Sequence, residues 1–170
     1  MFATDRLWLR PTLEEDADFI VEVFNTPGAL RFIGDRDINS KELALEFIYN
    51  RPLVQLEELG YSNYTIIERV SGAKVGVAGL YARPYLEHSD LGYALLPKYE
   101  GKGYAREASR RLLEAAHEDF ELETICAITH PENHRSSKLL LDLGFEQVDE
   151  VELPEIKGTS LYFEIALNKV

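Results

Sequence analysis

Cysteine is almost absent from this chain of 170 residues, because Cys126 is the only one. A lone cysteine cannot form an intrachain disulfide, and this usage is typical of a reducing compartment. The apolar residues around Cys126 predict that it packs in the core. No apolar run approaches the length of a membrane span, and the charged N-terminal residues contain no signal-peptide core. We therefore expect a cytoplasmic protein that does not insert into membranes.

Basic side chains are also scarce, with 18 Lys and Arg against 30 Asp and Glu and a net charge of −12. This charge repels phosphate backbones and anionic lipid heads, which argues against a nucleic-acid or membrane partner. It would attract a cationic partner, although it is equally well explained as a charge that maintains solubility. No repeat, low-complexity tract or linker divides the chain, so we expect a single domain over residues 1–170.

Several catalytic motifs are missing. There is no Walker GxxxxGK followed by Ser or Thr, and no GxSxG elbow for serine hydrolysis. A dinucleotide fingerprint beginning at Gly101 fails because Arg106 occupies the third glycine position. His130 and His134 have the spacing of a metal-binding pair, but Pro131 starts the helix after His130, so the two do not share a helical face. We expect no metal.

The hydrophobic pattern changes period along the chain and predicts seven strands and four helices in the order β-αα-βββ-α-β-α-ββ. Pro52 should split the second helix, and Gly60 and Gly144 should end helices. A strand–helix–strand unit inside an antiparallel meander indicates an α+β fold with a mixed sheet. The expected strands are 6–10, 61–69, 74–83, 91–96, 123–130, 145–153 and 160–167, and the expected helices are 12–24, 40–59, 104–117 and 133–143.

The segment LGYALLPKYEGKGYAREA, residues 91–108, carries the strongest functional signal. A strand enters a loop with two glycines, and the loop opens directly onto a helix. Free backbone N–H groups at such a helix N-terminus bind anions, and a pyrophosphate fits them well. Lys98, Lys102 and Arg106 place three cations within nine residues of an otherwise acidic chain. The segment therefore predicts a phosphate ligand.

Residues 98–103, KYEGKG, match the acetyl-coenzyme A loop (Gln or Arg, two residues, Gly, one residue, Gly or Ala), with Lys as the leading residue. Together with the opening RLWLRP and the late block NHRSSKLLLDLGF (133–145), the chain resembles the GNAT superfamily of N-acetyltransferases. It looks most similar to the RimJ/RimL-like branch, which modifies the N-termini of ribosomal proteins. The resemblance implies a mixed, mostly antiparallel, V-splayed sheet flanked by about four helices.

The resemblance also implies a site for acetyl-CoA as cosubstrate. Loop amides would hold the pyrophosphate, and pantetheine would pair with backbone between the strands 91–96 and 123–130 like an added strand. Asn133 would hydrogen-bond to the pantetheine arm. The sequence alone favours a plain helix N-cap at Asn133, and both roles can coexist. The implied cofactor-binding residues are Leu95, Leu96, Lys98, Gly101, Lys102, Gly103, Tyr104, Ala105 and Asn133.

Direct acetyl transfer needs a neutral amine, a polarised thioester carbonyl and a stabilised leaving thiolate. Asp90 lies nearest the position of the family's acidic base, with Glu87 and His88 as weaker candidates; a solvated strand-end carboxylate is the simpler interpretation of Asp90. A strand N–H near Leu95 would polarise the carbonyl. The family's usual tyrosine is Leu140 here, and the resemblance assigns the thiol side to Ser136. That serine is explained equally well as a polar residue of the first helical turn.

For the acceptor we expect a protein N-terminus first and a small cationic amine, such as a polyamine or aminoglycoside, second. An α-amine with a pKa near ~7.8 is roughly a tenth neutral at pH 7, far more than a lysine-like amine near ~10.4. Trp8, Phe32, Tyr81 and Tyr85 are candidates for an acceptor pocket or for the core. A different class is a coenzyme A-binding module without catalysis. Either a monomer or a homodimer fits the sequence.

Overall fold

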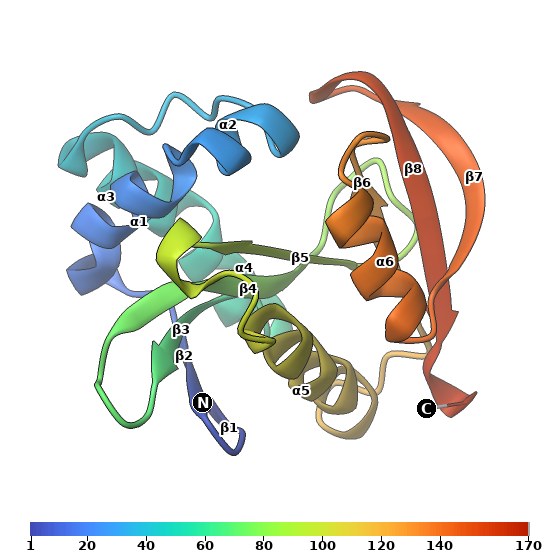
Figure 1. Cartoon of the computed structure of the whole chain (residues 1–170), viewed down its shortest axis with the longest axis horizontal. Coiled ribbons are helices and arrows are strands. Elements are labelled where there is room, and N and C mark those ends of the chain that lie inside the picture. The colour runs from blue at the N-terminus through green and yellow to red at the C-terminus, as the bar shows by residue number, and fades with distance from the viewer. Residues whose placement is uncertain (170) are drawn as a thin grey trace.

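An eight-stranded sheet forms the centre of the protein in a computed structural model that describes residues 1–169 (Figure 1). Its strand order is β1-β2-β3-β4-β5-β6-β8-β7. Every neighbouring pair is antiparallel except β5 and β6, which are parallel, as expected for the mixed sheet. The strands are β1 (Phe2–Ala3), β2 (Leu7–Pro11), β3 (Asn63–Glu68), β4 (Lys74–Tyr81), β5 (Asp90–Leu95), β6 (Thr124–Thr129), β7 (Glu146–Leu153) and β8 (Ile156–Ala166).

Helices cover both faces of this sheet. The first four lie over one face, and α5 crosses the other, where it contacts β2, β4 and β5 (Figure 1). α6 packs on β6 and β7. The helices are α1 (Ala17–Phe24), α2 (Pro27–Phe32), α3 (Lys41–Asn50), α4 (Pro52–Leu59), α5 (Tyr104–Glu118) and α6 (His134–Asp142).

Residues 1–169 thus contain six α-helices, where the pattern predicted four. The split at Pro52 was expected, because proline lacks the N–H that would continue the preceding helix. The additional helix, α2, begins where the Thr26 side chain accepts a hydrogen bond from the N–H of Ala29 and Pro27 occupies the first turn. Gly60 and Gly144 have positive φ angles of 81° and 98° and end α4 and α6 as expected.

The start of the first helix was predicted wrongly. Thr12 does not cap it; the Thr12 side chain is buried and bonds Thr65 and Asn63. α1 begins at Ala17, after a 3₁₀ turn over Glu14–Asp16. Asp16 is fully buried and pairs with Arg10 at 2.8 Å and Lys74 at 2.6 Å, so tertiary ion pairs determine this helix start.

Two hydrophobic clusters lie on opposite faces of the sheet. On one face, Ala108 and Leu112 of α5 pack against Leu80 of β4. On the other, Ile20 of α1 and Ile48 of α3 pack on alternate strand residues such as Val77. This alternation is the period-two pattern that identified the strands in the sequence. Because both faces are covered, the central strands are held rigidly, and a site between them has a firm scaffold.

Candidate functional site

The sheet opens between its two central parallel strands. β5 and β6 pair at one position, Asp90 with Cys126, where the Cys126 N–H donates to the Ser89 carbonyl at 3.0 Å. Beyond Asp90 no further pairing joins the two strands in the described chain, and Figure 1 shows them diverging. This is the V-shaped splay that the family resemblance implied. It leaves part of each strand's backbone without a ladder partner.

The alternation along β5 determines which backbone groups face this opening. The Leu96 N–H donates to Val75 of the β4 side at 2.9 Å, and the Leu96 carbonyl accepts from Tyr99 at 2.9 Å. Because successive strand residues direct their N–H and C=O groups to opposite sides, Tyr93 and Leu95 direct theirs toward β6. Within the residues that the structure describes, the Leu95 N–H therefore has no strand partner, whereas the Leu96 N–H is already used within the protein.

The glycine loop presents a row of backbone donors at the wide end of the opening. Gly101 and Gly103 have φ angles of 74° and 82°, a conformation that side chains disfavour. Gly103 is the N-cap of α5 and offers no side-chain cap. Within residues 1–169, no protein acceptor receives a hydrogen bond from the backbone N–H of any residue from Gly101 to Arg106. Consecutive free donors at a helix N-terminus fit a diphosphate, so the residues present suit the pyrophosphate of coenzyme A.

Two lysines of the loop flank one aromatic ring. The Nζ atoms of Lys98 and Lys102 each lie 5.1 Å from the Tyr99 ring centroid. Such cation–π contacts hold two flexible side chains near the loop, with their charges exposed. The local excess of positive charge noted in the sequence is thus assembled in space beside the free N–H groups.

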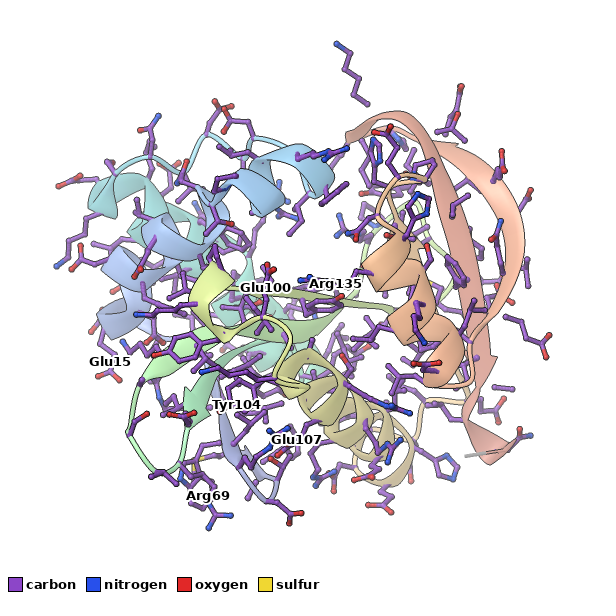
Figure 2. All side chains as sticks on the ribbon, in the orientation of Figure 1. Glu15, Arg69, Glu100, Tyr104, Glu107 and Arg135 are labelled. Atoms are coloured by element: carbon purple, nitrogen blue, oxygen red, sulfur yellow. The ribbon has the colours of Figure 1, made fainter. Side chains whose placement is uncertain are left out.

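Arg6 supports the loop from the N-terminal segment, a role that the sequence did not reveal. Its Nη1 donates to the Lys102 carbonyl at 2.9 Å, its Nε and Nη2 contact Glu107 at 2.7 and 2.6 Å, and its guanidinium stacks on the Tyr104 ring. Tyr104 in turn bonds Glu68 of β3. Figure 2 shows Tyr104 and Glu107 together at the start of α5. The sequence signal that could have indicated this role is the position of Arg6 in the opening RLWLRP.

Asn133 and Ser136 lie at the start of α6, on the other side of the opening. The Asn133 Oδ1 accepts a hydrogen bond from the Ser136 N–H at 3.2 Å, so the N-cap interpretation of Asn133 is confirmed. Its side-chain NH₂ has no partner in the described residues and stays available. Ser136 interacts with the phenol of Tyr93; burial raises the pKa of Tyr93, and the Ser136 contact partly opposes this. Tyr93 is a site residue that strand alternation next to the loop would have identified.

An ion pair spans the opening itself. Arg135 of α6 contacts Glu100 of the glycine loop at 2.6 Å, and Figure 2 shows the two side chains meeting between the two halves of the molecule. Both are largely exposed, with 69% and 41% of their side-chain surface accessible. An exposed pair of this kind stabilises by less than about 1 kcal/mol, so it opens readily.

Asp90 lies at the closed end of the opening. It is not a solvated strand-end carboxylate, which was the simpler interpretation of the sequence. It is buried, and its Oδ1 accepts a hydrogen bond from the Arg83 Nε at 2.7 Å. Burial raises the pKa of Asp90 above its ordinary value, while the charge of Arg83 opposes this rise. The solvation argument failed because Arg83, beyond the end of β4, folds back over the start of β5.

The other base candidates lie outside the opening. Glu87 and His88 precede the junction at Asp90, and together with Tyr61 they line a surface hollow against residues 121–124. The His88 carbonyl accepts from the Cys126 thiol at 3.2 Å. They therefore lie on the closed side of the junction.

The four candidate aromatic residues separate into two groups. Trp8 lies under Arg69, far along the sheet. Phe32 of α2 stacks obliquely on His130, with ring centroids 5.8 Å apart. Tyr81 packs over Gly79 and Gly92 beside Asp90. The Tyr85 hydroxyl accepts from Arg83 at 3.1 Å. Phe32, Tyr81 and Tyr85 thus lie around the opening, Phe32 beside the end of β6 and the two tyrosines at the closed end, and Trp8 does not.

Cys126 and His130 have structural roles outside the site. Cys126 is fully buried, and burial raises the pKa of its thiol to about 12. His130 accepts a hydrogen bond from the Glu132 N–H at 3.1 Å. In the part of the chain that the structure describes, no three His, Cys, Asp or Glu side chains are grouped to hold a metal ion. None of the described helices combines the length and apolarity needed to cross a membrane.

A parallel pair that splays, with a donor-rich glycine loop at its wide end, defines an acetyl-CoA-dependent acetyltransferase. Comparison with known proteins supports this class. The family model described as "Acetyltransferase (GNAT) domain" matches residues 6–146, and the chain belongs to this family. An uncharacterized N-acetyltransferase of Bacillus subtilis, YoaA, is 27% identical over 145 residues, covering 85% of this chain and 81% of that protein.

Solved structures agree on the fold. A ribosomal-protein-S5-alanine acetyltransferase from Vibrio fischeri superimposes with a TM-score of 0.80 at 20% identity, covering 98% of this chain and 96% of the other. A mutant of a spermidine N-acetyltransferase from Vibrio cholerae gives a TM-score of 0.76 at 19% identity, with the same coverage of 98% and 96%. These two neighbours act on different amines, so the shared fold does not identify the acceptor.

Proposed function

We propose that this N-acetyltransferase transfers the acetyl group of acetyl-CoA directly to an α-amine, with a protein N-terminus as the first candidate acceptor. The observation that carries the proposal is the row of free N–H groups from Gly101 to Arg106 beside the opened strands. The likeness in fold to a ribosomal-protein acetyltransferase is consistent with a protein N-terminus. Bound acetyl-CoA would supply an activated acyl group with a thiolate leaving group.

The geometry supports the following cofactor-binding roles. Amides of residues 101–105 (Gly101, Lys102, Gly103, Tyr104 and Ala105) would hold the pyrophosphate, and Lys98 and Lys102 would neutralise its charge. The free N–H and C=O of Tyr93 and the C=O of Leu95 would pair with the extended pantetheine arm, which leaves the Leu95 N–H for the acetyl carbonyl. The Asn133 NH₂, which its capping role leaves free, would donate to the same arm. Leu96 would contribute only its buried side chain, because its N–H already donates to the carbonyl of Val75 in β4.

The chemical step needs three contributions from the protein. The Leu95 N–H would stabilise the negative charge that develops on the carbonyl oxygen. Asp90, buried and with a raised pKa, lies about 16 Å along β5 from Leu95, so it would take the proton that the amine loses through a chain of waters. Ser136, beside the Tyr93 phenol, would give a proton to the sulfur as the carbon–sulfur bond breaks. The proposed site is therefore divided between β5 and the start of α6.

A cationic small amine is a weaker candidate acceptor. The net charge of −12 favours it at long range, and a spermidine acetyltransferase shares the fold. At the closed end of the opening, however, the local charge is positive, because Arg36, Arg51 and Arg83 lie within electrostatic reach of one another there. Long-range attraction without a local binding group gives little specificity.

Release of free thiol from acetyl-CoA, measured with and without amine, tests the proposal. We expect turnover that depends on an α-amine, with peptides preferred over lysine side chains at pH 7. Calorimetry with coenzyme A measures cofactor binding separately. Tight cofactor binding without turnover on any peptide or small amine would favour a non-catalytic coenzyme A-binding module, and no binding at all would refute the site.

A further inference from the structure

Three arginines gather at the closed end of the opening, on the face covered by α1–α4. Arg36 lies in the connection between α2 and α3, Arg51 lies between α3 and α4, and Arg83 follows β4. The Arg83 guanidinium lies 5.9 Å from the Tyr81 ring centroid, and the Tyr85 hydroxyl that it contacts lies 3.4 Å from Glu155, which approaches Arg51. Burial lowers the pKa of Arg36, and the charges of Arg83 and Arg51 lower it further, while Tyr81 and Asp90 oppose this. This concentration of cations is the reverse of the chain's net charge of −12.

The acidic side chains nearby do not balance these arginines. Asp90 is bound by Arg83, and Glu155, which is half exposed, approaches Arg51 only to 4.0 Å. Arg36 forms no ion pair with any side chain in the described part of the chain, and its buried Nε has no hydrogen-bond acceptor there. Three positive charges thus face two negative ones.

The sequence neighbours of Arg36 do not neutralise it. Asp35 and Asp37 flank it, but both are exposed, and Asp35 accepts a hydrogen bond from the Asp37 N–H at 2.8 Å. The Arg36 guanidinium stacks instead on the Phe24 ring of α1, 5.2 Å from its centroid. It is held by packing, with part of its donor capacity unused. Unused buried donors of a cation are unfavourable unless an anion meets them.

Arg83 also retains donors. Its Nε is used by Asp90 and one N–H of Nη1 by the Tyr85 hydroxyl, and its Nη2 has no hydrogen-bond partner within residues 1–169. The planar fork of a guanidinium matches a carboxylate in two parallel hydrogen bonds, which is why arginine is common in carboxylate recognition.

The location relates this cluster to the acceptor. The glycine loop follows the end of β5, so the cofactor arm would run back along β5 toward Asp90. Tyr81 packs over Gly92 beside Asp90, and the α2–α3 connection and the β7–β8 turn lie along the same upper edge in Figure 1. α2 also reaches the β6–α6 connection, where Arg31 approaches Glu132 at 3.6 Å. The arginines therefore line the side from which an amine would approach.

We propose that Arg36 and Arg83 bind a carboxylate of the acceptor, so that the substrate is an α-amine with a carboxylate a few bonds away. Two sources share this chemistry: a free amino acid, and a peptide N-terminus with an acidic side chain near the amine. A polyamine would meet the arginines with like charge and bind poorly. This inference rests on the proposed function, since it specifies the acceptor of the same site.

Matched acceptors test the inference. Rates of thiol release are compared for an amino acid and its amide, for peptides with Asp or Asn at the second position, and for spermidine. Arg36→Gln is the test variant, and Arg110→Gln is its control because it removes the same charge from the exposed face of α5. We expect kcat/KM to favour the carboxylate member of at least one pair by about 10-fold or more, a preference that Arg36→Gln removes and Arg110→Gln retains.

The outcomes separate this inference from the proposed function. Turnover that is equal for acids and amides, or fastest with spermidine, would overturn the carboxylate site and leave acetyl transfer intact. Preference for the free amino acid would identify a small-molecule acceptor, and preference for the Asp peptide would identify a protein N-terminus. If no amine is acetylated, the coenzyme A complex is titrated calorimetrically with the same acids and amides. Binding of the acids that Arg36→Gln abolishes then supports the site, and absence of that binding refutes it.

Discussion

Replacing Gly103 with Ala should weaken coenzyme A binding more than it weakens the fold. Gly103 has φ of 82°, and a Cβ there would lie 3.3 Å from the Arg6 Nη2, the group whose neighbour Nη1 holds the Lys102 carbonyl. A left-handed conformation costs an L-residue about 1–2 kcal/mol. Rotation of the loop would relieve this strain and would turn the free N–H groups away from the phosphate.

The expected size of the effect follows from that strain. If about 1–2 kcal/mol favours the relaxed loop, the binding-competent loop is populated at roughly 3–20%, and the apparent Kd rises by about 5- to 30-fold. Displacement of Arg6 adds to this. Global stability should fall by no more than the strain itself, because relaxation absorbs part of it.

Two other glycines provide matched controls. Gly72 has φ of 71° in the β3–β4 turn with no atom near its Cβ position, so Gly72→Ala should reduce the melting temperature without changing the Kd of coenzyme A. Gly101 has φ of 74° and equally open space but lies in the loop, so Gly101→Ala should give an intermediate Kd. Calorimetric Kd values and thermal melts of the three variants measure these differences. A Gly103→Ala protein that binds coenzyme A like the wild type would refute our account of the loop.

Three further predictions concern single side chains. Ser136→Ala should lower kcat by about 10- to 100-fold with little change in the KM for acetyl-CoA. Tyr93→Phe should lower kcat by a smaller factor. If the wild type and both variants had equal kcat, Ser136 would have no part in the chemistry. Asp90→Asn should lower the free energy of unfolding in urea by about 3 kcal/mol, because it leaves the mostly buried Arg83 without its charged partner. The same variant should lose the rise of kcat with pH. If it retained the turnover of the wild type, Asp90 would be excluded as the base. With a pKa of about 12, Cys126 should resist thiol reagents at pH 8 until urea unfolds the protein, and fast labelling of the native enzyme would contradict its burial.

Local patterns in the sequence were sufficient for most of the fold. Alternation identified β2 and β3, an apolar run identified the buried strand β6, and glycine punctuation ended α4 and α6 at the observed residues. The short helix α2 escaped prediction because six residues contain too few turns to show a period. The start of α1 was missed because Asp16 is fixed by Arg10 and Lys74, partners that only the tertiary structure brings near.

The candidate site divides in the same way. Its phosphate end is a continuous segment, so residues 98–105 showed both the glycines and the charge in the sequence. The closed end is assembled from distant segments, and no spacing rule relates Arg36 to Arg83 or either of them to Asp90. Arg6 escaped for the same reason, since its role depends on a contact with a loop almost a hundred residues later.

The cofactor end and the acceptor end of the site are built differently, and this difference affects acceptor specificity. The cofactor end depends on backbone N–H groups, which any sequence with the right glycines can present, and so it is shared among enzymes that acetylate different amines. The acceptor end that we propose depends on side chains from the α2–α3 connection and the segment after β4, whose burial is decided by tertiary packing. Because Arg36 is held on Phe24 with a buried donor unused, this end is preorganised before any acceptor arrives. Acceptor choice in this chain should therefore change with substitutions at Arg36 and Arg83, while coenzyme A affinity stays constant.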